Sequence, residues 1–581
     1  MQGLLFMTDT WRNQLYFGDN LDVLREHIPD ASVDLIYLDP PFNSNATYNV
    51  LFRERSGEQS AAQITAFEDT WHWGIEAERT FHELVTAGPK KVADLMQALR
   101  AFLGQNDVMA YLTMMAIRLV ELHRVLKPTG SLYLHCDPTA SHYIKLVLDA
   151  IFGPRQFKNE IIWKRSSAHS DTKQGMRRYG RVHDVILFYT KTETYTWNSQ
   201  YLPYDEKYVQ EFYRYVEPET GRRYRMDNLT AAKPGGDTQY AWRVKRRIDP
   251  PGPWQADLDD EWQNPQPGWE YKAVYPYRGR FWAYSKENMI AFERAGRLVY
   301  TKTGMPCYKR YLDEQPGVPL QDIWDDIPPA LGKEDLGYPT QKPQALLERI
   351  INASSNPGDL VLDPFCGCGT AVVAAEKLGR RWIGIDITYL AIDLIERRLQ
   401  DTFGDELHPY EVHGAPKDLP SARALAQRDR HQFEWWALSL VDAHPAQDKR
   451  KGADRGIDGF IYFFDDDSGQ AKRIVVQVKS GAVNVGQVRD LRGVIDREQA
   501  AIGVLITLEP PTEPMKREAV AAGFYEPPRF PGRRYPRLQI LTVQELLSGA
   551  RVQYPQLAPV ATFKRAKRER KKQLRQERLA L

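Results

Sequence analysis

Strand-like and helix-like segments alternate at both ends of residues 14–400, and this alternation limits the fold more than any other feature. The chain runs through QLYFGD (14–19), LDVLREHI (21–28) and SVDLIYLDPPF (32–42), where apolar and aromatic residues lead into turn residues. The same order returns at DLVLDPFCGCGT (359–370). Strands that alternate with helices predict a parallel α/β sheet whose working loops lie at the carboxyl ends of the strands.

The chain is too long for one hydrophobic core, because 581 residues exceed the roughly 100–200 of a typical domain. A stretch rich in Tyr, Trp, Arg and Pro interrupts the alternation, and a polar stretch precedes a further α/β segment. We expect six segments: a first α/β part (1–154), an insert (155–335), a second α/β part (336–412), a linker (413–430), a C-terminal α/β domain (431–549) and a basic tail (550–581).

Several classes of protein are excluded by composition. No apolar run reaches the roughly 20 residues that cross a bilayer, and residues 1–13 lack the pattern of a secretory signal. The four cysteines are too few and too scattered for a disulfide framework or a four-cysteine zinc site. We therefore expect a reduced, cytoplasmic protein without a membrane span.

The net charge of +2 hides two basic regions. Residues 155–249 hold 19 basic and 12 acidic side chains, and residues 564–578 hold 9 basic and 2 acidic ones. Both regions are candidates for contact with a polyanion, although a charged run is more often a solvated surface.

The tetrapeptide Asp39-Pro40-Pro41-Phe42 directly follows an apolar strand. An exocyclic amine of adenine or cytosine is a poor nucleophile because its lone pair is delocalised into the ring. The Asp39 carboxylate and the Pro40 carbonyl could accept both amine hydrogens while Phe42 stacks on the extruded base. The pattern predicts chemistry on a nucleobase amine; the alternative is a tight turn fixed by the prolines.

A second loop, Asp363 to Thr370, lies between a strand and a helix, and its glycines allow a ligand to approach the backbone. The next strand ends in Asp386, whose carboxylate could accept hydrogen bonds from two ribose hydroxyls. The GxGxxG spacing of dinucleotide sites is absent. An adenosine without a pyrophosphate fits best, and S-adenosylmethionine is such a molecule.

LDPPFNS, YPTQKP (338–343) and VLDPFCGCGT, in this order, resemble the β group of DNA amino-methyltransferases, which make N6-methyladenine or N4-methylcytosine. The resemblance covers roughly residues 14–400 and implies a Rossmann-like sheet with a target-recognition insert. It also implies that S-adenosylmethionine is bound by Asp19, Lys342, Asp363, Phe365, Gly367, Gly369 and Asp386.

The acid at position 39 favours adenine N6 over cytosine N4, since the cytosine enzymes of the family more often carry Ser there.

The insert interleaves Arg and Lys with aromatic residues in RRYRMDN (222–228), YAWRVKRR (240–247) and YPYRGRFWAY (275–284). Such segments suit contacts to phosphates and bases, with a polar surface as the alternative. We expect double-stranded DNA as the partner and allow for a homodimer.

The C-terminal domain carries a second constellation. Asp458 begins a strand, and Gln477 and Lys479 share one face of a later strand because side chains two apart point the same way. An acid, a second oxygen ligand and a lysine can hold Mg²⁺ and orient water for attack on a phosphodiester. The acidic run 465–467 is expected to be the turn between the strands.

This arrangement resembles the Mrr-like branch of PD-(D/E)xK restriction endonucleases over about residues 431–525, which adds Glu434 to the acidic site. The whole chain is thereby expected to be a restriction–modification fusion whose nuclease is blocked by its own methylation. Gln477 in place of an acid weakens the metal site, so the alternative is a DNA-binding sensor with an inactive nuclease.

Overall fold

The computed structural model describes residues 11–41, 47–53, 59–68, 73–137, 140–166, 177, 179–180, 182–236, 238–331, 334–336, 338, 340–446, 456–463, 465, 472–528 and 532–555. The chain divides into two compact units. One unit is Ser199–Leu320, and the other joins Met1–Asn198 to Gln321–Leu581. No helix in the described part of the chain is both long and apolar enough to cross a membrane.

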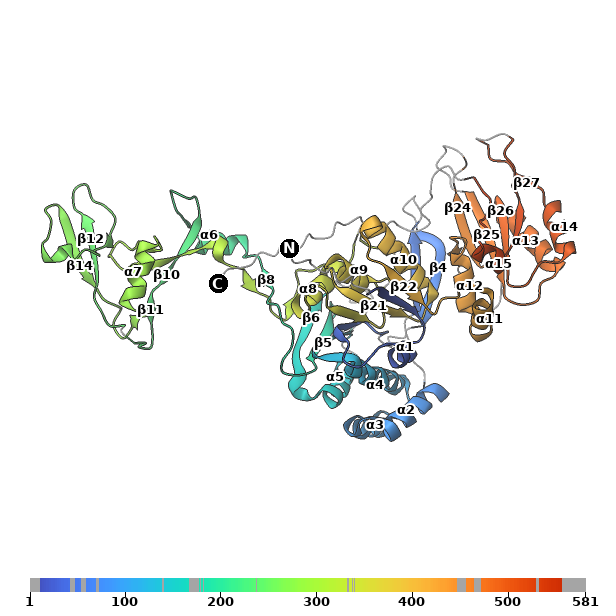
Figure 1. Cartoon of the computed structure of the whole chain (residues 1–581), viewed down its shortest axis with the longest axis horizontal. Coiled ribbons are helices and arrows are strands. Elements are labelled where there is room, and N and C mark those ends of the chain that lie inside the picture. The colour runs from blue at the N-terminus through green and yellow to red at the C-terminus, as the bar shows by residue number, and fades with distance from the viewer. Residues whose placement is uncertain are drawn as a thin grey trace, which may run out of the picture. The chain divides into compact units, whose positions relative to one another are not determined.

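The larger unit is built on a nine-stranded sheet in the order β19-β6-β7-β5-β2-β20-β21-β1-β22 (Figure 1). Only β7 runs antiparallel to its neighbours. The strands are β1 (Asn13–Phe17), β2 (Val33–Leu38), β5 (Leu126–Cys136), β6 (Phe157–Lys164), β7 (His183–Thr190), β19 (Ile323–Trp324), β20 (Leu360–Asp363), β21 (Arg381–Asp386) and β22 (Tyr410–His413). The predicted α/β sheet is confirmed.

Helices cover both faces of this sheet (Figure 1). The helices on the sheet are α1 (Asn20–His27), α4 (Asp107–Val125), α5 (Ser141–Phe152), α8 (Gln344–Ser354), α9 (Thr370–Lys377) and α10 (Tyr389–Phe403). Two more helices, α2 (Ile75–Ala87) and α3 (Lys90–Leu103), pack against α4 on the side away from the sheet (Figure 1). A hairpin of β3 (Thr47–Arg53) and β4 (Gln59–Glu68) follows β2.

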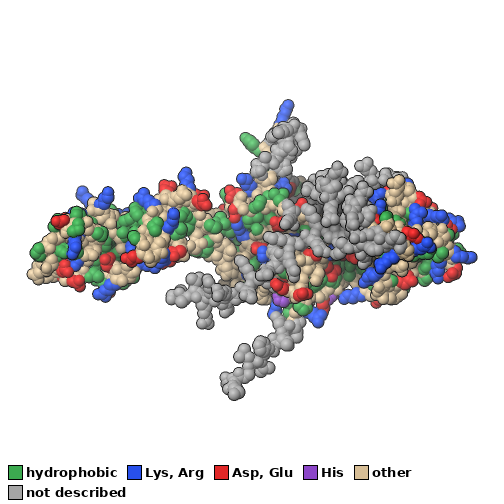
Figure 2. Space-filling model, turned by 90° about the horizontal axis from the view of Figure 1, so that it is seen from above, with side chains coloured by type: hydrophobic (Ala, Val, Ile, Leu, Met, Phe, Trp, Pro, Cys, Tyr) green, Lys and Arg blue, Asp and Glu red, His purple; other side chains and the backbone are tan. Residues whose placement is uncertain are grey.

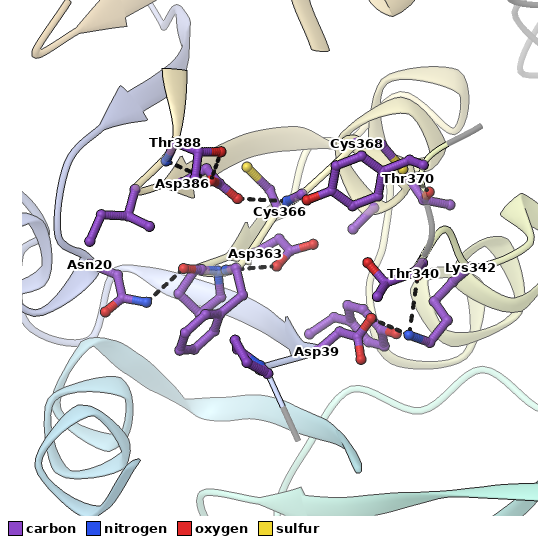
Figure 3. Close-up of a pocket in the computed structure, with 18 of the residues that line it drawn as sticks. Asn20, Asp39, Thr340, Lys342, Asp363, Cys366, Cys368, Thr370, Asp386 and Thr388 are labelled. Atoms are coloured by element: carbon purple, nitrogen blue, oxygen red, sulfur yellow. Dashed lines mark hydrogen bonds and ion pairs between the residues drawn. The ribbon is translucent and has the colours of Figure 1, made fainter. Parts of the chain in front are cut away.

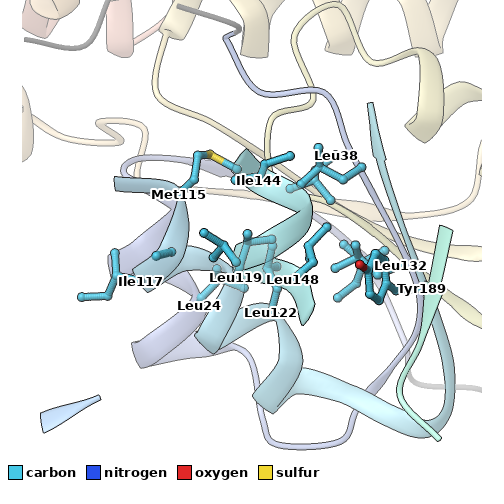
Figure 4. Close-up of a cluster of buried hydrophobic side chains, with 14 of the residues drawn as sticks. Leu24, Leu38, Met115, Ile117, Leu119, Leu122, Leu132, Ile144, Leu148 and Tyr189 are labelled. Carbon is cyan, nitrogen blue, oxygen red and sulfur yellow. The ribbon is translucent and has the colours of Figure 1, made fainter. Parts of the chain in front are cut away.

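The core of the larger unit is centred on α4, of whose 19 residues twelve are buried. This helix is apolar nearly all round because α1, α2, α3 and α5 surround it. Leu119 and Leu122 of α4 lie beside Leu148 of α5 in the cluster shown in Figure 4. The packed helices provide the rigid support for the strand ends that carry the motifs.

The described residues of the smaller unit form a four-stranded antiparallel sheet, β16-β17-β10-β9, a three-stranded one, β13-β12-β14, and the two-stranded pairs β11-β15 and β18-β8. Its core is rich in tryptophan, with Trp242, Trp254 and Trp282 buried. Its elements are α6 (Glu206–Phe212), β9 (Tyr215–Val216), β10 (Arg223–Asn228), β11 (Thr230–Ala231), β12 (Trp242–Arg247), β13 (Gln255–Ala256), β14 (Trp269–Val274), β15 (Phe281–Trp282), α7 (Lys286–Arg294), β16 (Leu298–Tyr300) and β17 (Pro306–Tyr311); β8 (Tyr201–Leu202) pairs with β18 (Val318–Pro319).

This unit is shorter than the insert expected at 155–335. The strands β6 and β7 fall inside the expected range but belong to the large sheet. Their apolar side chains, such as Trp163 and Ile186, are buried there, and this burial outweighs the polar composition of the surrounding sequence.

The C-terminal domain is a five-stranded sheet, β23-β24-β25-β26-β29, in which β25, β26 and β29 are parallel. Its elements are α12 (Arg430–Ser439), β23 (His444–Pro445), β24 (Gly459–Phe463), β25 (Lys472–Lys479), α13 (Val485–Arg497), β26 (Ile502–Thr507), α14 (Glu513–Ala521), β27 (Phe524–Tyr525), β28 (Tyr535–Pro536), β29 (Leu538–Thr542) and α15 (Val543–Leu547). The stretch expected to be a linker, 413–430, contains α11 (Leu419–Arg428), which begins with a capping box of Asp418 and Ser421.

Candidate active site

A pocket of about 350 Å³ opens at the carboxyl ends of four neighbouring strands, β2, β20, β21 and β1 (Figure 3). The predicted residues that line it are Asp19, Asp39, Pro41, Lys342, Asp363, Phe365, Gly367 and Asp386. Pro40 is buried beside it, Gly369 caps α9 behind it, and Phe42 lies outside the described residues. The sheet order thus brings together segments from both ends of residues 14–400.

Two glycines shape the loop between β20 and α9. Gly367 and Gly369 have φ angles of +49° and +75°, a left-handed conformation that other residues rarely adopt. A Cβ atom on Gly367 would lie 3.3 Å from the Tyr338 ring, and one on Gly369 would lie 2.7 Å from Ile395 Cγ1. Only glycine fits the backbone and the space at Gly369, which is the N-cap of α9.

Asp386 links this loop to the next one. Its Oδ2 accepts a hydrogen bond from Gly367 N (2.9 Å), and its Oδ1 accepts bonds from Thr388 N (2.9 Å) and Thr388 Oγ1 (2.8 Å). Burial raises the pKa of Asp386 despite these bonds. Burial, together with Asp39 and Asp386, raises the pKa of Asp363 well above its usual value.

The buried carboxyls of Asp363 and Asp386 can be compared with the groups that S-adenosylmethionine would bring into the pocket. A buried carboxylate is costly unless a cation or hydrogen-bond donors compensate it. A ligand that carries a positive sulfonium and ribose hydroxyls offers both, and the glycine loop leaves its backbone open to such a ligand. The residues present therefore fit this cofactor.

Asp39 and Lys342 meet on the other side of Asp363. Lys342 Nζ forms an ion pair with Asp39 Oδ2 and donates a longer hydrogen bond to Thr340 O (3.4 Å). Both side chains are largely buried, with 10 % of Lys342 and 16 % of Asp39 exposed. The pair connects the expected catalytic loop to the YPTQKP segment.

Arg118 of α4 is a pocket residue that sequence reasoning missed. Its Nη2 donates to Asp19 Oδ1 (2.9 Å) and Oδ2 (3.0 Å), and its Nε donates to Asn20 Oδ1 (2.5 Å). Asn20 Nδ2 in turn donates to Pro364 O (2.8 Å). Arg118 therefore holds the loops after β1 and β20 together; its one signal in the sequence is an arginine inside an otherwise apolar helix.

A buried chain of polar side chains lies next to the pocket, and it too was missed. The Tyr37 hydroxyl is 3.1 Å from His135 Nδ1, and His135 Nε2 is 3.2 Å from Asp184 Oδ2. Arg165 pairs with the other Asp184 oxygen at 3.2 Å. Although burial raises the pKa of Asp184, His135, Lys342 and Arg165 lower it below the usual value. Tyr37 lines the pocket two residues before Asp39.

In the C-terminal domain, Asp458 immediately precedes β24, and its Oδ2 accepts a hydrogen bond from Val478 N (2.7 Å). Gln477 is 5 % exposed, and its Oε1 has no hydrogen-bond partner among the described residues. Gln477 and Lys479 lie on the same face of β25, as predicted.

The expected acidic site is less complete. Glu434 on α12 forms ion pairs with Arg430 (3.2 Å) and His431 (3.5 Å) of its own helix. Among the residues that the structure describes, no three His, Cys, Asp or Glu side chains form a group that could hold a metal ion. Asp465 is buried and accepts a hydrogen bond from the Tyr525 hydroxyl, while residues 466–467 lie outside the described part. These residues do not support the expected Mg²⁺.

Two family models match the chain. A model described as DNA methylase matches residues 33–397, and a model described as NACHT-associated inactive Restriction Endonuclease 1 matches residues 430–548. The second match supports a restriction-endonuclease-like region but describes it as inactive.

Curated relatives that match the chain include the following three. Type II methyltransferase M.EcaI of Enterobacter cloacae is 31% identical over 50% of this chain and 57% of its own length. The StyLTI Mod subunit of a type III restriction-modification enzyme from Salmonella typhimurium is 25% identical over 63% and 50%. DNA adenine methyltransferase YhdJ of Escherichia coli is 25% identical over 66% and 81%. The chain spans about half the length of the first two relatives.

The methylase model covers more than half of the chain and includes the Asp39 loop, the insert and the glycine loop. The chain belongs to the DNA methylase family.

Proposed function

We propose that the protein transfers a methyl group from S-adenosylmethionine to N6 of adenine in double-stranded DNA. The observation that carries this proposal is that Asp39 lines the same pocket as Asp363 and Asp386. A group that can bind a base amine and groups that suit a cationic nucleoside thus share one site.

The sheet order suggests how the pocket is used. The strands β2, β20, β21 and β1 are consecutive, so Asp39, Asp386 and Asp19 follow one another across the pocket. Asp386 would hold the ribose hydroxyls of the cofactor, between Asp19 at one end of this row and Asp39 at the other. When bound, S-adenosylmethionine supplies a methyl group on a positively charged sulfur.

The chain's own groups then act on the target amine. The Asp39 carboxylate and the Pro40 carbonyl accept its two hydrogens and direct the nitrogen lone pair towards the methyl group. After transfer the nitrogen must lose one proton, and Asp39 is the carboxylate placed to take it. Lys342 keeps Asp39 in position through their ion pair.

Adenine is preferred to cytosine for two reasons. Position 39 is Asp, and the relative YhdJ is named an adenine methyltransferase. Methylation of cytosine N4 remains the second candidate. Mass spectrometry of nucleosides after incubation of unmethylated DNA with the protein separates them: we expect 6-methyladenine, and 4-methylcytosine alone would refute the choice of base.

The smaller unit is the proposed DNA-reading module, and some of its basic side chains are engaged by other groups of the same unit. Arg243 stacks on Trp262 at 3.5 Å, and Arg246 pairs with Glu270 at 2.6 Å. In Figure 2 its Lys and Arg side chains are interspersed with Asp and Glu. Tyr275 and Tyr277 are 61 % and 54 % exposed, so the segment 275–284 offers aromatic faces for bases.

For the C-terminal domain we infer DNA binding without cleavage. The matching family is described as inactive, and the carboxylates expected to bind Mg²⁺ are engaged by protein groups. We expect unmethylated plasmid DNA to stay intact with the protein and Mg²⁺. Cutting that is lost in both Asp458→Ala and Lys479→Ala would instead establish the nuclease.

A further inference from the structure

Helix α10 begins at the wall of the cofactor pocket. Asp386 ends β21, Ile387 and Thr388 continue along the pocket wall, and Tyr389 is the first helical residue. Thr388 Oγ1 donates to Asp386 Oδ1 (2.8 Å) and accepts a hydrogen bond from Ala391 N (3.3 Å). The position of the Asp386 carboxylate is therefore coupled to the first turn of α10.

A residue of the C-terminal domain caps this first turn. The first N–H groups of a helix have no partner within the helix, so an outside acceptor stabilises them. Tyr389 N donates to Gln432 Oε1 at 3.0 Å. Gln432 lies on α12, inside the range that matches the inactive restriction endonuclease model.

The side chain of Tyr389 meets the same helix. Its hydroxyl is hydrogen-bonded to Ser439 at the end of α12, and burial raises the pKa of Tyr389 to about 12 against the effect of that bond. The Tyr389 ring packs edge-on against Phe17, the residue before the Gly18–Asp19 wall of the pocket. Tyr389 thus contacts α12 through both its backbone and its side chain.

An ion pair strengthens the same interface. Arg397 of α10 pairs with Asp393 on its own helix (3.0 Å) and with Asp442 just beyond α12 (2.6 Å). Along α10, therefore, polar contacts to the C-terminal domain occur at its first turn and again two turns later.

We propose that the C-terminal domain is a structural part of the methyltransferase cofactor site, and that Gln432 is a positioning residue for the loop carrying Asp386. The inference rests on the proposed S-adenosylmethionine site. Gln432 touches no reacting atom; it fixes the N-terminus of α10, and through Thr388 it fixes the carboxylate that faces the ribose. A restriction-like domain retained in this way contributes to methylation even if it cuts nothing.

The coupling works in both directions, because a coupling free energy between two sites is reciprocal. A cofactor that orders the Asp386 loop also favours the docked position of α12. Cofactor occupancy therefore stabilises the C-terminal domain against local opening.

Two substitutions of similar size separate the acceptor from the packing. Gln432→Leu removes the acceptor for Tyr389 N, whereas Gln432→Glu keeps an acceptor oxygen there, now on a carboxylate whose charge suits the positive end of the helix. Gln487→Leu is the matched control: Gln487 Oε1 accepts a bond from Asn484 N at the N-terminus of α13, in the same domain but outside the pocket.

Calorimetry with S-adenosylhomocysteine on the full chain gives the first measurement. We expect Gln432→Leu to raise its Kd about three- to tenfold, the loss that one helix cap produces, and to raise KM for S-adenosylmethionine without lowering kcat. Gln432→Glu and Gln487→Leu should stay within about twofold of the parent.

The second measurement is amide hydrogen exchange of the same variants without any cofactor. Exchange at the start of α10 should speed up in Gln432→Leu and be restored in Gln432→Glu. If the Leu and Glu variants and the Gln487 control behave alike in both measurements, the inference is overturned. If the parent chain does not bind S-adenosylhomocysteine, the proposed function fails, while the exchange data still report on the contact itself.

Discussion

Lys342 Nζ pairs with Asp39 Oδ2 across 303 positions of sequence, so the segment before the glycine loop directly contacts the expected catalytic loop. The contact arises because β2 and β20 are neighbours in the sheet although the insert separates them along the chain. It places a cation beside the group proposed to bind the amine.

Asp39→Asn should abolish methyl transfer and spare cofactor binding. The amide has one oxygen instead of two and cannot take the proton, and loss of a positioned acid or base typically costs about 10²–10⁴-fold in rate. Tritium transfer from labelled S-adenosylmethionine to DNA measures the rate, and calorimetry with S-adenosylhomocysteine measures binding. A rate within tenfold of the parent would remove Asp39 from the mechanism.

Lys342→Met should slow transfer about 10- to 100-fold, the range expected when a hydrogen bond to a charged group is lost. If Lys342 acts through Asp39, the two substitutions will not add: Lys342→Met in the Asp39→Asn background should change the rate little. Full additivity of the two effects in single-turnover assays would mean that Lys342 has an independent role.

Gly369→Ala should destabilise the protein by about 2–4 kcal/mol, because it combines backbone strain with a clash in the core. Its Cβ would lie 2.7 Å from Ile395, at a φ of +75°. Gly379→Ala is the control, since its φ is +69° and its Cβ would meet open space. Urea denaturation should give the larger loss at Gly369; equal losses would show that strain alone matters there.

The α/β fold and the loops after β2 and β20 could be predicted because both depend on local patterns, whereas Asp19 and Lys342 were expected only from the family resemblance. Apolar runs just before Asp39 and up to Asp363 identify two strand ends, and neighbouring parallel strands bring their carboxyl ends together. The same logic placed Gln477 and Lys479 on one face of β25.

Residues whose role depends on long-range packing could not be found in this way. Arg118 resembles any helical arginine until α4 is packed against the loop after β1. Asp184 and His135 lie on β7 and β5, whose antiparallel pairing no local pattern announces. Gln432 is a polar helix residue in the sequence, and only the docking of α12 on α10 gives it a partner.

The affinity for S-adenosylmethionine should rise with pH more steeply than that for S-adenosylhomocysteine. Burial raises the pKa of Asp363 and of Asp386, so both carboxyls are protonated more readily in the cofactor-free protein than in water. A cationic ligand favours their ionised forms, so its binding releases protons and strengthens as pH rises through the raised pKa values. S-adenosylhomocysteine lacks the sulfonium charge and should respond less.

The folding stability depends on pH in the opposite direction to the affinity for S-adenosylmethionine. A carboxyl with a raised pKa in the folded state contributes stability below its unfolded pKa, near 4, and loses it as pH rises through the folded value. Without cofactor, Asp363 and Asp386 should therefore lower the free energy of unfolding as pH increases, and S-adenosylmethionine should offset this loss.

Calorimetry with both ligands from about pH 5 to pH 8 tests the difference. The quantity to follow is the affinity for S-adenosylmethionine divided by that for S-adenosylhomocysteine. Asp363→Asn should flatten the pH dependence of this affinity ratio. Asp359→Asn is the matched control, because burial also raises the pKa of Asp359 but its side chain does not line the pocket. An affinity ratio that does not change with pH in the parent chain would mean that neither buried carboxyl faces the sulfonium.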